Sequence, residues 1–112
     1  MAVDRNQVIA DIEALMAAAA RCEEQLQAAR SAYEIGLTKL RDGASIEDAL
    51  AAGDAPRVRA AVTDALAELE RARKTSRVSL IRADLADGTP VTAVARTWGV
   101  SHQLVSRYLH EE

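Results

Sequence analysis

The sequence is poor in the residues that form disulfides and metal sites. It contains one cysteine, Cys22, and two histidines, His102 and His110. One cysteine excludes a disulfide within the chain, and three scattered ligands do not make up the four of a structural zinc site. We therefore expect no metal and no cofactor, and the lone cysteine suits a reducing compartment such as the cytoplasm.

Export signals and catalytic motifs are also missing. No stretch approaches the roughly 18 consecutive apolar residues that cross a bilayer, and residues 1–5 do not start an export signal. The sequence has no paired carboxylates in an apolar setting, no serine or cysteine near a histidine, and no glycine-rich phosphate loop. We expect a protein that is not an enzyme, has no membrane partner, and is cytoplasmic, or nucleoid-associated when bound to DNA.

The residues that are present favour helix. Apolar residues make up 49% of the chain, alanine supplies much of that share, phenylalanine is absent, and there are only two prolines. Such a composition with few β-branched runs is typical of helices. The length of 112 residues suits one small domain, or a short module on an extended support. The expected fold class is all-α.

A heptad pattern extends through the first 40 residues. Apolar or small residues recur there in alternating steps of four and three, which predicts a long helix with a coiled-coil seam. The predicted seam is Val8, Ile12, Leu15, Ala19, Cys22, Leu26, Ala29 and Tyr33, continuing to Gly36 and Leu40. The seam can pack on a helix of the same chain or on a second copy. We favour the second copy, because one chain of this length buries little area.

Turn and capping residues divide the rest of the chain. Gly43 is placed to end the first helix, and Ser45 to cap a short helix over residues 46–52. A third helix begins near Pro56, and no glycine or proline follows before Gly88.

The third helix can run unbroken into the C-terminal part or break at residues 74–76, and both alternatives stay open. We predict a helical hairpin, a coiled-coil-like stalk that dimerises, over residues 1–75, and a three-helix head over residues 76–112.

Charge is divided unevenly along the chain. Residues 1–70 carry 7 Lys and Arg against 13 Asp and Glu, whereas residues 71–112 carry 7 against 4. The C-terminal part can therefore approach phosphates, and the acidic stalk is repelled by them or binds another protein.

The sharpest local pattern lies in residues 88–109. Thr89 is expected to cap, and Pro90 to open, a short helix that ends at Gly99, and Ser101 is placed to begin a second helix. Two short helices joined by a glycine turn predict a DNA-binding helix-turn-helix. Its expected core is Val94, Trp98, Val100, Val105 and Leu109, closed by Ile81 and Leu85.

Residues of this head are assigned to DNA bases and phosphates. Arg107 can read a guanine edge, clamp a phosphate or simply solubilise the surface, and Gln103 suits adenine. The candidates for reading bases are Ser101, His102, Gln103, Ser106 and Arg107. The candidates for phosphates are Arg73, Lys74, Arg77, Thr92 and Tyr108.

Residues 81–109 resemble the DNA-binding domain of serine recombinases, the resolvases and invertases. The resemblance rests on Ile81, Leu85, Gly88-x-Pro90, Ala95, Trp98-Gly99 and Arg107-Tyr108 before Leu109. It implies a homeodomain-like head in which Gln103 and Arg107 face the major groove. Residues 1–75 do not resemble the catalytic domain of those enzymes, so recombination is not implied.

These patterns together predict a sequence-specific protein for double-stranded DNA, acting as a homodimer. A transcriptional regulator or a phage or plasmid accessory factor would fit. The alternative is a coiled-coil adaptor that binds another protein and uses its helix-turn-helix for docking.

Overall fold

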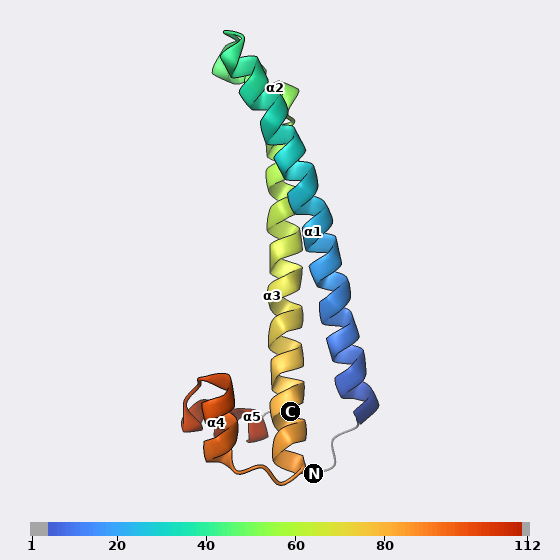
Figure 1. The fold of residues 1–112 in the computed structure, drawn as a ribbon, viewed down its shortest axis with the longest axis vertical. Helices are drawn as coiled ribbons and strands as arrows, with labels where there is room; N and C mark the ends of the chain where they lie inside the picture. Colours follow the sequence, from blue (N-terminus) through green and yellow to red (C-terminus); the bar gives the residue numbers. More distant parts are fainter. Residues whose placement is uncertain (1–4, 111–112) are drawn as a thin grey trace. The chain divides into compact units, whose positions relative to one another are not determined.

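The structure is a computed structural model that describes residues 5–110, and every regular element among them is a helix (Figure 1). The helices are α1 (Arg5–Arg41), α2 (Ile46–Ala52), α3 (Ala55–Ala86), α4 (Val91–Trp98) and α5 (His102–His110). The predicted fold class is confirmed: the chain is all-α, with a helical hairpin followed by a small helical head.

Two compact units share the long helices. The hairpin unit is Met16–Glu70, and the head unit joins residues 5–15 with residues 71–110. Helix α3 passes through residues 74–76 without a break. Of the two alternatives for this segment, the structure has the continuous helix.

Local capping ends the helices of the hairpin unit where the sequence predicts. Helix α1 ends before Gly43, which has a φ of +90°, and the Ala44 N–H donates to the Lys39 carbonyl oxygen at 3.0 Å. The Ser45 Oγ accepts from the N–H of Asp48 at 3.1 Å and caps α2. The turn between α1 and α2 is therefore specified by local sequence.

The interior of the hairpin unit is built from small residues. Ala18, Cys22 and Ala29 of α1 are buried, as is Ala65 of α3. The backbones at Gly53 and Ala32 also approach closely. A Cβ added to Gly53 would lie only 2.8 Å from the carbonyl oxygen of Ala32. The contact consequently buries little area for its length.

An ion pair ties the two long helices together within the hairpin unit. The Arg21 guanidinium donates hydrogen bonds to the carboxylate of Glu68 across α1 and α3. This hydrogen bond raises the pKa of Arg21 above its ordinary value. Both side chains remain largely exposed, so the pair adds orientation more than stability.

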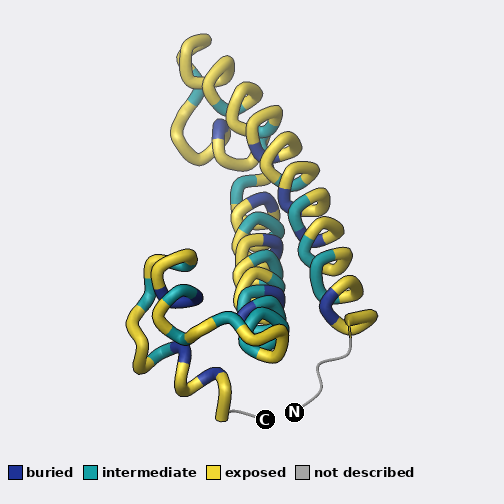
Figure 2. Tube along the Cα trace, turned by 60° about the horizontal axis from the view of Figure 1, so that its bottom comes forward, coloured by how far each residue is buried: buried dark blue, intermediate teal, exposed yellow. Residues whose placement is uncertain are grey.

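The predicted seam residues are not all buried, because buried and half-buried positions of α1 alternate with exposed ones (Figure 2). Val8, Cys22 and Ala29 are buried, and Ile12, Leu15 and Ala19 are half-buried. Leu26 and Tyr33 are exposed, at 48% and 63%.

Small Ala18, and not Ala19, takes the most buried position between Leu15 and Cys22. Neighbouring residues of a helix point about 100° apart, so burial of Ala18 turns Ala19 partly toward solvent. At Ala19, Leu26 and Tyr33 the residue one position earlier is the more buried one. The face of α1 that packs within the chain therefore lies slightly to one side of the predicted seam.

Candidate nucleic-acid interface

One small core holds the end of α3, α4 and α5 together. Its buried residues are Ile81 from α3, Val94 and Ala95 from α4, and Val105 and Tyr108 from α5. Half-buried residues surround them: Val78, Leu85, Val91, Trp98, Val100 and Leu104.

The expected core is wrong at its last residue. Leu109 is 36% exposed, whereas Tyr108, with 4% exposure, fills the core in its place. The aromatic ring buries more area than the neighbouring leucine would, and α5 is turned by one residue to allow it.

A left-handed glycine sets the angle between α4 and α5. Gly99 has φ 64° and ψ 35°, and the Val100 N–H donates to the Ala95 carbonyl oxygen at 3.0 Å. A Cβ at Gly99 would meet nothing within 4 Å. Backbone conformation alone, with no steric crowding, therefore favours glycine here.

The start of α4 differs from the expectation. Thr89 does not cap the helix; Pro90 is the N-cap residue and makes no side-chain cap hydrogen bond. The Thr89 hydroxyl instead donates to Oδ1 of Asp84 at 2.5 Å. Because Thr89 precedes the cap position by one residue, its side chain reaches back to α3 and fixes the loop there.

Helix α5 starts as predicted. The Ser101 Oγ accepts from the N–H of Leu104 at 3.0 Å, in the manner of an N-cap serine. Val105 and Tyr108 then face the core. The predicted base-reading residues all lie on exposed surface: Ser101, His102, Gln103, Ser106 and Arg107.

The phosphate candidates divide into exposed and internal residues. Arg73, Lys74 and Thr92 are exposed, Arg77 is half-buried and Tyr108 is buried. The Arg77 Nη2 donates to the Tyr108 hydroxyl oxygen at 3.2 Å. Arg77 and Tyr108 thus contact each other inside the head, away from the positions that remain open to solvent.

Arg82 has a positioning contact that sequence reasoning missed. Its Nε donates to the main-chain carbonyl oxygen of Tyr108 at 2.6 Å. That carbonyl lies in the last turn of α5, where a cation is favourable. Arg82 and Arg77 together attach the end of α5 to α3, and no sequence signal distinguishes Arg82 from the exposed arginines of the same helix.

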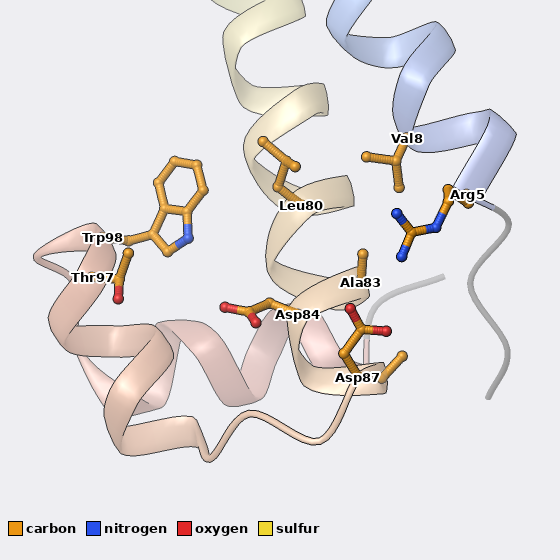
Figure 3. A pocket seen from close by; sticks show the side chains of 9 residues that line it. Arg5, Val8, Leu80, Ala83, Asp84, Asp87, Thr97 and Trp98 are labelled. Carbon is orange, nitrogen blue, oxygen red and sulfur yellow. The ribbon is translucent and has the colours of Figure 1, made fainter.

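A cavity of about 420 Å³ lies within the head unit, beside the core (Figure 3). Trp98 of α4 and Leu80 of α3 give it apolar walls, while Asp84, Asp87 and Arg5 contribute charged groups. Trp98 is half-buried and packs against the head core, in agreement with its interpretation as a core residue.

Between residues 5 and 110, no three His, Cys, Asp or Glu side chains gather in a way that could hold a metal ion. Within the same part of the chain, no helix combines the length and the apolar character that crossing a lipid bilayer requires. Compared with known protein families, with curated proteins and with solved structures, the chain shows no match.

Proposed function

We propose that the chain is a sequence-specific binding protein for double-stranded DNA, with α4 and α5 as a helix-turn-helix and α5 as the recognition helix. The observation that carries this proposal is the division of α5 into two faces. Val105 and Tyr108 lock one face to the core, and the opposite face exposes groups that can hydrogen-bond, among them Gln103 and Arg107, while Leu109 is the exposed apolar residue of the described helix. A short polar helix held on a small rigid head is what insertion into a major groove requires.

The spacing on α5 suits neighbouring bases. Gln103 and Arg107 are one helical turn apart, which is about 6 Å along the axis at 1.5 Å per residue. Base pairs are stacked about 3.4 Å apart, so the two side chains reach bases about two steps apart. Arg107 can donate two hydrogen bonds to O6 and N7 of a guanine, and the Gln103 amide can pair with N6 and N7 of an adenine.

Charge supports binding at the same unit. From Arg71 to His110 the only acidic residues are Asp84 and Asp87, and Asp84 accepts the Thr89 hydroxyl. Exposed Arg73, Lys74 and Thr92 would contact the phosphate backbone and hold α5 in register. A protein that works this way acts in the cytoplasm, on the nucleoid, as a homodimeric transcriptional regulator or a phage or plasmid accessory factor.

Matched arginine variants test the proposal. Arg107→Ala removes a cation from the exposed face of α5, and Arg59→Ala removes one exposed cation from the hairpin unit at the same cost in net charge. Binding would be measured by fluorescence anisotropy against a selected duplex and its scrambled version at several salt concentrations. Helical circular dichroism would confirm that both variants fold.

The two variants should differ on the selected duplex. Loss of a bidentate base contact costs about 1–3 kcal/mol, so Arg107→Ala should weaken that complex roughly 5- to 150-fold. The scrambled duplex should lose less, and Arg59→Ala should change neither. Equal losses for Arg107→Ala on both duplexes would make Arg107 a phosphate contact, and no loss at all would remove α5 from the interface.

The adaptor alternative has its own supporting observation. Large apolar side chains are exposed in the hairpin unit, including Leu26, Tyr33 and Ile46, and such surfaces bind proteins. Retention on heparin or random-sequence DNA separates the two functions. Retention that falls steeply with salt supports DNA binding, whereas passage without retention at low salt supports the adaptor.

A further inference from the structure

An apolar groove of about 390 Å³ lies in the hairpin unit, where the end of α1, helix α2 and the start of α3 meet. Its largest lining side chains are strongly exposed. The exposed fractions are 63% for Tyr33, 45% for Leu37, 42% for Leu40, 67% for Ile46 and 52% for Leu50. The groove contains no charged residue.

Apolar residues of the second half of α1 share one broad side of the helix, where the small ones are buried or half-buried and the large ones stay exposed. Cys22, Ala29 and Gly36 form the stripe of small residues that packs inside the hairpin unit; a Cβ on Gly36 would lie 3.4 Å from the Ala49 carbonyl oxygen. Leu26 and Tyr33 belong to the stripe of large residues that continues through Leu37 and Leu40. At 100° per residue these four fall within one narrow face of α1. All four side chains keep at least 42% of their surface exposed.

The exposed area is large for so small a chain. With the exposed fractions given above, the six large side chains offer about 600 Å² per chain, the upper end of what a soluble monomer ordinarily leaves in its largest apolar patch. Two copies joined through it would bury about 1,200 Å², the lower end of the range for stable specific interfaces. The patch alone therefore supplies enough area for a dimer.

The charges around the groove allow self-association. Between residues 26 and 53 the basic residues are Arg30, Lys39 and Arg41, and the acidic ones are Glu34, Asp42, Glu47 and Asp48. This nearly neutral balance does not drive two copies apart, although the whole chain has a net charge of −3. Arg30 and Glu34, an exposed ion pair 3.7 Å apart on α1 next to Tyr33, place both signs near the patch, so each copy offers a basic and an acidic group to the other.

We propose that this groove binds a second copy of the same chain, so that Leu26, Tyr33, Leu37, Leu40, Ile46 and Leu50 form a homodimer interface. The contact between chains then uses the stripe of large residues, while the stripe of small residues closes the hairpin within each chain. The proposal rests on the proposed function in one respect: a helix-turn-helix commonly reads two half-sites, and a dimer presents two heads.

Single charges placed in and outside the groove test the interface. Leu37→Asp and Ile46→Asp each put a carboxylate into the patch at a side chain that already meets solvent. Leu66→Asp is the matched control, because Leu66 is 48% exposed on α3 of the same unit and does not line the groove. Sedimentation velocity of the full chain from about 1 to 100 µM would give the mass, and circular dichroism the helix content.

The wild type and Leu66→Asp should sediment as dimers, and both groove variants as monomers with unchanged helix content, their dissociation constants raised at least 100-fold. A monomeric wild type, higher oligomers, or a Leu66→Asp variant that dissociates as readily as Leu37→Asp would overturn the proposal. A groove variant that remains dimeric would overturn it as well.

The same variants separate this proposal from DNA binding. If both hold, Leu37→Asp should bind a single half-site with wild-type affinity and lose affinity only for a paired site. If the protein dimerises as expected but no variant binds DNA, the function fails and the interface stands. If DNA binds while the wild type sediments as a monomer, the interface fails alone.

Discussion

Replacing Gly99 tests whether the left-handed turn holds the head together. Gly99 has a φ of 64°, and a Cβ there would meet no atom within 4 Å. Gly99→Ala therefore adds no clash, and its cost is the backbone penalty of about 1–2 kcal/mol for an L-residue in this region. Gly99→Asn should cost less, because asparagine tolerates the left-handed region better.

Gly43 provides a matched control in the hairpin unit. Its φ is +90° and a Cβ there would also meet nothing within 4 Å, so Gly43→Ala carries a similar penalty outside the head. The chain has one tryptophan, Trp98, which packs against the head core and makes its fluorescence a local reporter of unfolding.

Urea unfolding followed by Trp98 fluorescence measures the effect. A loss of 1–2 kcal/mol should lower the midpoint for Gly99→Ala by roughly 1 M, since small domains lose about 1–3 kcal/mol per molar urea. Gly99→Asn should lie between this variant and the wild type, and Gly43→Ala should leave the Trp98 transition in place. The reasoning is refuted if Gly99→Ala unfolds at the wild-type midpoint, or if Gly43→Ala moves the Trp98 transition as far.

Three further substitutions have expected outcomes in the same urea assay. Gly53→Ala should destabilise the hairpin unit by about 1–3 kcal/mol by circular dichroism, because the new Cβ would lie 2.8 Å from the Ala32 carbonyl oxygen; a stabilised variant would show that the helices separate freely. Ser101→Ala should cost the head about 1 kcal/mol through the lost hydrogen bond from the Leu104 N–H, and an unchanged Trp98 midpoint would rule out the cap. Ile81→Ala should cost about 2–5 kcal/mol, since Ile81 is fully buried; a loss below about 1 kcal/mol would mean the core is not packed as described.

Helix ends were predictable because their causes are local. Gly43, Gly99 and the capping serines Ser45 and Ser101 all adopt the roles that the sequence indicates. A glycine that ends a helix or a serine that accepts from an N–H three residues later acts within one turn of chain. Thr89 is the exception, because its hydroxyl found a partner on α3 instead.

The packing of α1 was harder to predict because periodicity does not reveal which helix faces which. Ala18 and Ala19 both fit the apolar heptad spacing, and only the close approach of a neighbouring helix selects Ala18 for burial. The large side chains of Leu26 and Tyr33 make the pattern stronger, yet the tight contact within the hairpin unit excludes them. Hydrophobicity predicted that a seam exists, and the position of the neighbouring helix decides which side of it is buried.

The exposed face of α5 was predictable, and its attachment to α3 was not. The helical spacing of apolar and polar residues places Gln103 and Arg107 on the exposed side of α5. This holds whether the core ends in Tyr108 or in Leu109. The hydrogen bonds from Arg77 and Arg82 to Tyr108 join segments far apart in the sequence. Such contacts depend on the folded geometry. The sequence therefore does not tell whether a given arginine or lysine binds another part of the protein or DNA.

Selection of bound duplexes from a random DNA pool tests the central claim most directly. The full chain would be incubated with the pool at about 150 mM salt, and the bound fraction sequenced over successive rounds. DNA binding through α5 should enrich one short motif, present as two related half-sites for a dimer, and Arg107→Ala should relax preference at one or two positions in each half. A bound fraction that stays random over all rounds, or a motif that Arg107→Ala leaves unchanged, would contradict sequence reading by α5.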